Sequence, residues 1–498
     1  MSVTPAQPTD QHEDIAALAK GGRTNFFGFL LRLLARLPFL FIAGRLYGAE
    51  ALGRFASAMV IIELAGQLCT LGQKRGLAQR LSEDDETPPA NIVADAMVLS
   101  ALLALAMMAL LFVFPRIMFP GGKFSEWDLW LPLALLPTTL LDIALAALAY
   151  RYDVATTVRS RSVVEPWTLS IVAGALFYVI PGGGLSLAYL ASMLTSGAVA
   201  VLPLYRAYGL PRNWTPHPGR IARLAVTSLP LATADAVEWG TRKLDIFILR
   251  FFASDAAVGI YYVAQQVASL PQKLKTSFEP ILGPVITRNL KEHNYSAIAR
   301  QVCQVGFWII AAQAGIALAL GIPGEGVMGL VGPNFVGGTG ALAFLLAAEV
   351  VAATAVVSEA ALIYVARFQN LVVSVFTIAL QAALTLGGML LVDHWGLGQL
   401  YRAAAAAAAL MLSLGVASLI KAWLLSRILR EPINPWRWPL LWAAVPAIAV
   451  GTAATRYLPE WAELALGIPC ILGIYVFIIW HKGFGPEDRV LFRKNVAG

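Results

Sequence analysis

The chain has 498 residues, of which 58% are hydrophobic and only 13% are charged, and its mean hydropathy is +0.68. Charged residues make up about 25% of an ordinary soluble protein, so this composition excludes a set of soluble domains and indicates a protein that crosses a bilayer repeatedly. The net charge of +7 does not indicate a nucleic-acid partner, because the Lys and Arg residues fall on alternate loops, as membrane topology requires.

Long apolar segments follow one another along almost the whole chain. Because a spanning helix needs about 20 mostly apolar residues, the sequence predicts about fourteen transmembrane helices, with loops too short to hold a catalytic domain. We expect the helices at residues 24–47, 54–73, 91–114, 129–150, 164–181, 185–205, 223–251, 259–280, 301–322, 341–364, 370–392, 400–425, 438–456 and 463–481.

The distribution of Lys and Arg predicts the orientation of these helices. Most of them, including Lys74, Arg75 and Arg161, fall on loops of one side, together with the basic residues of the C-terminal tail. The opposite loops hold only Arg54, Arg116, Lys123 and Arg456. Positively charged loops stay in the cytoplasm, so we expect both termini there.

The two halves of the chain share a short motif. Gly53-Arg-Phe-Ala-Ser-Ala58 and Gly259-Ile-Tyr-Tyr-Val-Ala264 both read Gly-x-aromatic-x-x-Ala, and the same offset of 206 residues superposes Arg36 on Arg242. The even number of helices between the two copies predicts a parallel repeat, in which two bundles move against each other. The expected parts are a cytoplasmic segment (1–23), two six-helix bundles (24–205 and 223–425) joined by a cytoplasmic linker (206–222), two additional helices (438–481) and a cytoplasmic tail (482–498).

The first helix carries two arginines on one face. Arg32 and Arg36 are four residues apart, Asn25 lies on the same stripe, and no acid in that helix pairs with them. Arginines at membrane depth need an anion or a water-filled cavity. The alternatives are that they reach the membrane surface with their long side chains or pair with acids on other helices.

The seventh and eighth helices each carry a polar face. Asp235, Glu238, Arg242 and Asp245 recur at helical spacing, so their common face looks into a cavity or a polar helix interface. Alternatively, Glu238 and Asp245 neutralise Arg242 locally. The eighth helix presents Gln265 and Gln272 on one face, which also indicates a cavity wall.

Further acids lie inside the predicted helices. They are Glu63, Asp142, Glu349 and Glu359. These acids are either counter-ions for the arginines or protonatable coupling sites, since burial favours the neutral form of a carboxyl group; we favour the counter-ion role for most of them. Asp95, Glu165 and Lys421 lie near predicted helix ends, where we expect them at the membrane interface. The three cysteines, Cys69, Cys303 and Cys470, are too scattered for a metal site.

Three segments resemble one known family. Residues 45–58 are similar to the first hairpin of polysaccharide transporters in the multidrug/oligosaccharidyl-lipid/polysaccharide (MOP) exporter superfamily, residues 244–264 resemble the corresponding second-half pattern, and Gly332-Pro-Asn-Phe335 resembles the loop before the tenth helix. The resemblance implies an all-α polytopic fold of the multidrug-exporter type, without cofactor or catalytic residues. It also implies flipping of a polyprenyl-diphosphate-linked oligosaccharide across the bacterial inner membrane for O-antigen (lipopolysaccharide) or exopolysaccharide assembly, with a polysaccharide polymerase or export machinery as partner.

Arginines suit this substrate, because a guanidinium donates two parallel hydrogen bonds to phosphate. We therefore expect Arg32, Arg36 and Arg242 to bind the diphosphate. A multidrug or cation antiporter and a lipid II flippase of the same superfamily remain alternatives. A membrane glycan polymerase or ligase is a weaker one, because the outer loops at 115–128 and 323–340 carry no suitable acid/base pair.

Overall fold

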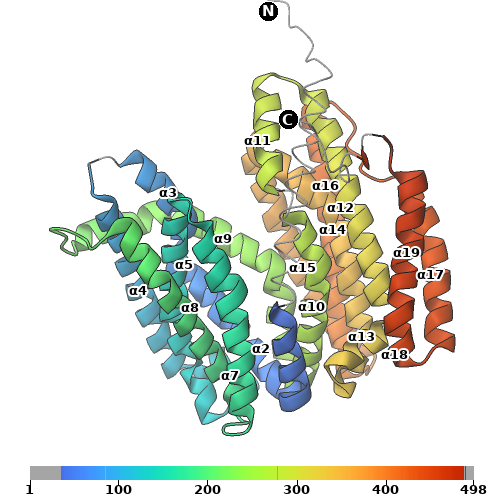
Figure 1. Cartoon of the computed structure of the whole chain (residues 1–498), viewed down its shortest axis with the longest axis horizontal. Helices are drawn as coiled ribbons and strands as arrows, with labels where there is room; N and C mark the ends of the chain where they lie inside the picture. The colour runs from blue at the N-terminus through green and yellow to red at the C-terminus, as the bar shows by residue number, and fades with distance from the viewer. Residues whose placement is uncertain (1–34, 85, 277–278, 487, 490–498) are drawn as a thin grey trace, which may run out of the picture. The chain divides into compact units, whose positions relative to one another are not determined.

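The computed structural model describes residues 35–84, 86–276, 279–486 and 488–489. Within these ranges the chain is helical and contains no β-strand (Figure 1). Nine helical segments of the described residues are long and apolar enough to cross a membrane. The predicted class, an all-α multi-pass membrane protein, is therefore confirmed.

The first described helix runs from residue 35 to 42 and continues into a π-helical turn, η1 (Ala43–Tyr47). The other helices are α2 (Gly48–Thr70), α3 (Gln73–Glu83), α4 (Pro89–Val113), η2 (Pro115–Ile117), η3 (Glu126–Ala134), α5 (Leu135–Tyr150), α6 (Val154–Thr157), η4 (Val158–Val164), α7 (Glu165–Phe177), α8 (Gly184–Tyr208), α9 (Pro218–Phe252), α10 (Asp255–Thr276), α11 (Glu279–Lys291), α12 (Tyr295–Gly321), α13 (Gly324–Val331), η5 (Pro333–Gly338), α14 (Thr339–Val365), α15 (Arg367–His394), α16 (Gln399–Leu429), α17 (Pro439–Tyr457), α18 (Glu460–Ala462), η6 (Glu463–Gly467), α19 (Ile468–Ile478) and η7 (Ile479–Gly483).

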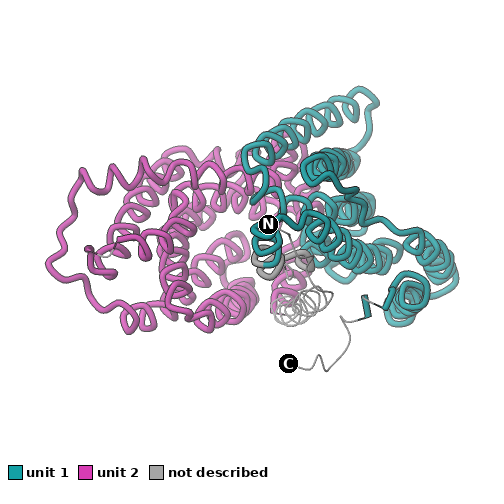
Figure 2. The backbone as a smooth tube through the Cα atoms, turned by 90° about the horizontal axis from the view of Figure 1, so that it is seen from above, with its two compact units in different colours: residues 1–31, 263–498 teal, residues 32–262 magenta. Residues whose placement is uncertain are grey.

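The chain divides into two compact units, coloured separately in Figure 2. Unit 2 is formed by residues 32–262, and unit 1 contains the described residues from Val263 onward. The boundary falls inside α10, so α9 is grouped with the helices of the first predicted bundle. Most charged residues of α9 have their partners on α2, on α3 or within α9 itself.

A break between α2 and α3 shapes the interior of unit 2. Leu71 and Gly72 both have left-handed backbone conformations, with φ angles of 47° and 71°. A Cβ atom on Gly72 would overlap with Leu231 and the backbone of Ala232 in α9. Gly72 thus permits both the sharp turn and the close approach of α9, which no larger residue allows.

The two motif glycines of the repeat lie against each other in unit 2. A Cβ atom on Gly53 would overlap with the backbone of Asp255 and Gly259, and one on Gly259 would overlap with the backbone of Ala49 and Gly53. Small residues allow helix backbones to approach closely in membranes. The shared glycine of the motif therefore serves the packing of α2 on the start of α10.

Unit 1 has an extended apolar core between α12, α14, α16, α17 and α19. Phe307, Tyr475 and Leu425 are almost fully buried in it. The two C-terminal helices join this core at places where a glycine faces a larger side chain, namely Gly315 opposite Tyr475 and Gly451 opposite Ile322.

Candidate functional site

Charged side chains gather inside unit 2, on the first helix and on α2, α3, α5, η4, α7 and α9. Each of these side chains forms at least one ion pair of 4.0 Å or less. The six basic side chains are Arg36, Lys74, Arg75, Arg161, Arg242 and Lys243, and the five acidic ones are Glu63, Asp142, Glu165, Asp235 and Glu238.

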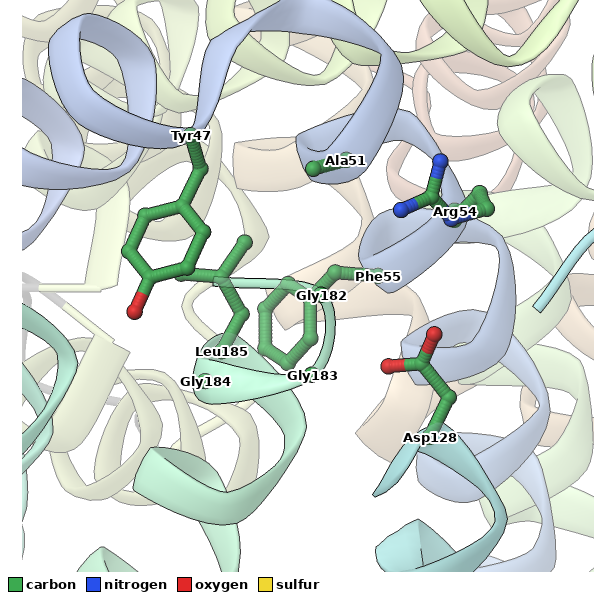
Figure 3. A pocket seen from close by; sticks show the side chains of 9 residues that line it. All are labelled: Tyr47, Ala51, Arg54, Phe55, Asp128, Gly182, Gly183, Gly184 and Leu185. Carbon is green, nitrogen blue, oxygen red and sulfur yellow. The ribbon is translucent and has the colours of Figure 1, made fainter. Parts of the chain in front are cut away.

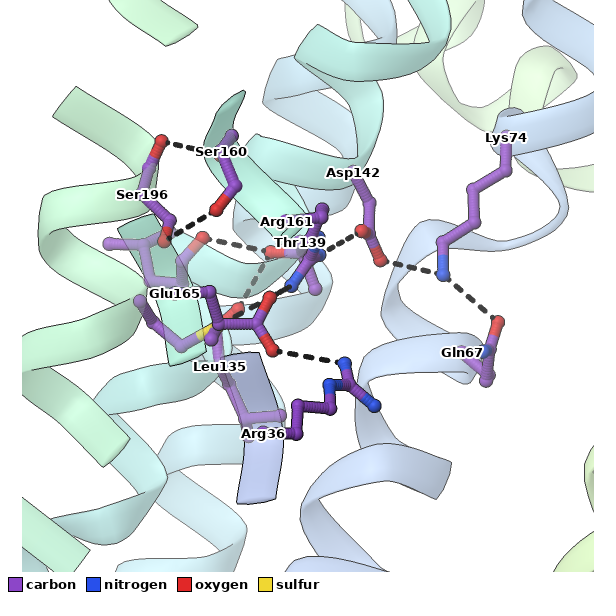
Figure 4. Close-up of polar contacts among 12 residues, drawn as sticks. Arg36, Gln67, Lys74, Leu135, Thr139, Asp142, Ser160, Arg161, Glu165 and Ser196 are labelled. Carbon is purple, nitrogen blue, oxygen red and sulfur yellow. Dashed lines mark hydrogen bonds and ion pairs between the residues drawn. The ribbon is translucent and has the colours of Figure 1, made fainter. Parts of the chain in front are cut away.

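One part of this arrangement, the Glu165 network, is drawn in Figure 4. Glu165 Oε1 lies 3.5 Å from Arg36 Nη2, and Glu165 Oε2 accepts a hydrogen bond from Arg161 Nη1 at 3.0 Å. Arg161 also donates to Asp142, whose other oxygen lies 2.6 Å from Lys74 Nζ. The carboxyl side chains of Glu165 and Asp142 are 14% and 15% exposed, so the acids of this network are largely shielded, whereas Arg36 at its edge is 57% exposed.

A second part, the Glu238 network, joins α3 to α9. Glu238 Oε2 accepts from Arg75 Nη2 at 2.5 Å, and Glu238 Oε1 lies 2.9 Å from Arg242 Nη2. Arg75 Nε also lies 3.0 Å from Asp235 Oδ1. The side chains of Arg75, Glu238 and Arg242 are 50%, 45% and 38% exposed, whereas Asp235 is 7% exposed.

The break after α2 brings the two networks together. It starts α3 at Gln73, so that Lys74 and Arg75 are consecutive residues of its first turn. Successive residues of a helix point in directions about 100° apart, and here Lys74 meets Asp142 while Arg75 meets the acids of α9. The Gln73 amide donates to Ser228 Oγ at 2.5 Å and ties the start of α3 to α9.

Other charges of α9 have separate partners. Lys243 Nζ lies 3.4 Å from Glu63 Oε2 of α2. Asp245 is fully buried and accepts a hydrogen bond from the Tyr261 hydroxyl. Arg250 is also buried, and it donates to the backbone carbonyls of Ser57 and Ile117.

Some predicted site residues lie elsewhere. Asn25 and Arg32 fall outside the described residues. Unit 1 holds Gln265 and Gln272, which are half-buried on α10, and Glu349, which is buried on α14. Unit 1 also holds Glu359, whose Oε2 accepts from Lys421 Nζ at 2.9 Å. The Lys421 side chain is 5% exposed, so this base is buried inside the unit beside its acid.

Four members of the networks were not predicted as site residues. Lys74, Arg75 and Arg161 were expected on loops, but they lie in the helical segments α3 and η4. Glu165 was expected near a helix end, and it is the first residue of α7. The available signal was the surplus of acids at depth, since Asp142 and Asp235 have no base four residues away on their own helix and so require partners from neighbouring segments.

A small pocket lies beside the turn that precedes α8 in unit 2 (Figure 3). It has an empty volume of about 190 Å³ and is lined by Tyr47, Ala51, Arg54, Phe55, Asp128, Gly182, Gly183, Gly184 and Leu185. Pockets for small ligands hold roughly 300–1,000 Å³. Its carboxylate, Asp128, accepts hydrogen bonds from Ser186 Oγ at 2.6 Å and from the Ser125 backbone N–H at 3.0 Å. Asp128 therefore takes part in the N-terminal cap of η3.

No metal centre is evident in the part of the chain that the structure describes. Within it, no group of three or more His, Cys, Asp or Glu side chains is placed to hold a metal ion. Cys69, Cys303 and Cys470 are free thiols.

Comparison with solved structures identifies the fold. A lipid II flippase MurJ in an inward closed conformation matches with a TM-score of 0.68 at 13% identity, covering 92% of this chain and 97% of that chain. An inward-facing multidrug-resistance MATE transporter of the MOP superfamily gives 0.64 at 15% identity, covering 80% and 95%. A MOP superfamily transporter from Pyrococcus furiosus, described as having a binding pocket of reverse polarity, gives 0.56 at 14% identity, covering 84% and 97%.

Comparison of the sequence identifies the family. Residues 19–290, more than half of the chain, match the family model described as polysaccharide biosynthesis protein. No curated protein is similar enough in sequence to count as a relative. The solved structures that share the fold are a flippase and multidrug-type transporters. The chain therefore belongs to the polysaccharide biosynthesis protein family and is a multi-pass membrane protein with the fold of the MOP-superfamily transporters.

Proposed function

We propose that this protein flips a polyprenyl-diphosphate-linked oligosaccharide across the bacterial inner membrane by alternating access. The substrate would move from the cytoplasmic to the periplasmic leaflet and serve the assembly of O-antigen or exopolysaccharide. The family match supports polysaccharide assembly as the context, and the fold supports transport. The charged interior of unit 2 supports an anionic substrate.

The observation that carries the proposal is the pair of part-exposed arginines related by the repeat. Arg36 and Arg242 are 57% and 38% exposed, and each is paired with one carboxylate. A diphosphate must cross about 30 Å of hydrocarbon, and moving such an ion unaided costs on the order of tens of kcal/mol. Arginines along its path replace the lost hydration, and their planar donors match phosphate oxygens.

A multidrug or cation antiporter is the less favoured alternative. A cationic substrate needs carboxylates that are not already engaged, whereas each acid of the two networks lies within 4.0 Å of a base. Bases outnumber acids in these networks and their neighbouring Lys243–Glu63 pair, which favours an anion. A lipid II flippase would use the same diphosphate chemistry, and the polysaccharide family match favours the oligosaccharide.

The proposal includes topology and partners. With both termini in the cytoplasm, the basic loops face the compartment where lipid-linked repeat units are made. A polysaccharide polymerase or export machinery would receive the flipped lipid on the other side. Most acids of the networks would act as counter-ions that keep the arginines in place between transport cycles.

The test is glycan assembly in cells that carry Arg36→Ala or Arg242→Ala at wild-type protein levels. We expect polyprenyl-diphosphate-linked repeat units to accumulate in the cytoplasmic leaflet and surface polymer to fall at least tenfold. The matched control is Arg456→Ala, since Arg456 is an exposed arginine in the last turn of α17 in unit 1. Normal polymer in both site variants would contradict the proposed site, and lost efflux of cationic drugs with normal polymer would favour the antiporter.

A further inference from the structure

Glu238 occupies an unusual position for an acidic side chain in an anion site. It lies between two arginines, Arg75 from α3 and Arg242 from its own helix, and gives one carboxylate oxygen to each. All three side chains are more than a third exposed. Exposed ion pairs contribute only about 0–1 kcal/mol, so this carboxylate is held weakly enough to be replaced.

Asp235 holds the Arg75 side chain in place independently of Glu238. It is 7% exposed, Arg75 Nε lies 3.0 Å from its Oδ1, and its Oδ2 is buried without a hydrogen-bond partner. If Arg75 left, a buried carboxylate would lose its close counter-ion, which is strongly unfavourable. Arg75 is therefore anchored through Nε, while its Nη2 atom faces Glu238.

Glu165 provides the contrast within the same unit. It also bridges two arginines, Arg36 and Arg161, but its side chain is 14% exposed and that of Arg161 is 25% exposed. Displacing Glu165 would leave charges in a largely shielded position, whereas Glu238 is 45% exposed and depends less on its two partners. The two bridging glutamates therefore differ in how easily an incoming anion can take their place.

We propose that Glu238 is a resident anion that occupies part of the diphosphate site when no substrate is bound. The inference rests on the proposed function and names the residues of that site: the diphosphate displaces the Glu238 carboxylate and binds the Nη atoms of Arg75 and Arg242. Binding then exchanges one set of ion pairs for another. Since a diphosphate also leaves by the reverse exchange, Glu238 keeps the affinity low enough for release on the far side.

The experiment measures binding of geranylgeranyl diphosphate and inorganic pyrophosphate to the purified full-length chain by calorimetry. Glu238→Gln removes the competing charge but keeps the shape of the side chain, so we expect Kd to fall about tenfold. Glu126→Gln, which changes an exposed acid in the first turn of η3, is the matched control and should not tighten binding. Arg75→Gln introduced together with Glu238→Gln should remove the gain.

Three outcomes would overturn the inference: unchanged Kd in Glu238→Gln, weaker binding in that variant, or equal tightening in both glutamate variants. Equal tightening would mean that any loss of negative charge is sufficient. If Glu238→Gln does not fold, Glu238→Asp is the second variant, because its shorter side chain cannot bridge both arginines as well. We expect the Kd of Glu238→Asp to lie between the wild-type value and the tenfold lower value expected for Glu238→Gln. An unchanged Kd would contradict the inference.

The outcome for this inference is separable from that for the proposed function. Loss of polymer in the Arg242→Ala cells combined with an unchanged Kd in Glu238→Gln would reject the resident anion and keep the flippase. Tighter diphosphate binding in Glu238→Gln combined with normal polymer in the arginine variants would reject the flippase and keep the anion site.

Discussion

Glu165 and Glu238 are built alike. Each bonds an arginine four residues away on its own helical segment, Arg161 and Arg242 respectively, and a second arginine from another helix. They differ in surroundings, since the Glu165 side chain is 14% exposed and that of Glu238 is 45% exposed. We therefore expect the two bridging glutamates to have different roles. Glu165 holds helices together, and Glu238 occupies a position that an anion can take.

The difference between them is one of desolvation. In a shielded site an uncompensated charge cannot be hydrated, so each partner depends on the other. In an exposed site water stabilises either partner alone, and the pair adds little to stability. Exposure, rather than the number of ion pairs, thus indicates which arginines of unit 2 are available to substrate.

The largest expected effect is on the shielded bridge. Glu165→Gln removes the partner of Arg36 and one of two acids bonded to Arg161, and breaking a buried ion pair costs about 3 kcal/mol. Thermal unfolding of the purified chain should show a clear fall in Tm. Glu126→Gln, which changes an exposed acid in the first turn of η3, is the control. Equal Tm values for the two variants would contradict a structural role for Glu165.

The next effect concerns the backbone contact between α2 and the start of α10. Gly53→Ala places a Cβ atom against the backbone of Asp255 and Gly259, and overpacking of this kind costs about 2 kcal/mol. Gly66→Ala is the matched control in the same helix, because a Cβ atom there meets nothing within 4 Å. Melting curves that rank the two variants in the opposite order would refute the close glycine contact.

A smaller effect is expected when the exposed bridge is removed. Glu238→Gln should change the free energy of unfolding by less than about 1 kcal/mol, since both arginines remain hydrated and Arg75 keeps Asp235. Its Tm should stay close to that of the wild type in the same measurement. A loss as large as that of Glu165→Gln would remove the distinction between the two bridges.

The smallest effect concerns Asp153, a carboxylate that lies outside both networks. Hydrogen bonds from the side chain and the backbone of Thr156 lower the pKa of Asp153, which caps α6. A lowered pKa stabilises the fold above the unfolded value of 3.8, and this contribution is lost as the pH falls through the folded value. Asp153→Ala should therefore cost about 0.5 kcal/mol at pH 7 and flatten the stability profile below pH 4. An unchanged profile would exclude the cap.

Several features of the fold were predictable because they depend on local pattern. The apolar segments predicted the helical class, and the spacing of Glu238 and Arg242 predicted their pairing as one alternative. The partners from other helices were not predictable. Lys74, Arg75 and Arg161 look like loop charges in sequence, and only the break at Leu71 and Gly72 and the helical turns around Arg161 bring them inside unit 2.

The most direct test of the account is transport by the purified chain in vesicles. A fluorescent polyprenyl-diphosphate-linked saccharide is incorporated in both leaflets, and a membrane-impermeant reductant reports which molecules reach the outer leaflet. We predict that the chain makes the protected half of the lipid accessible, and that Arg242→Ala slows this at least tenfold. A rate equal to that of protein-free vesicles, with the chain folded and incorporated, would contradict the proposal that this protein is a flippase for such lipids.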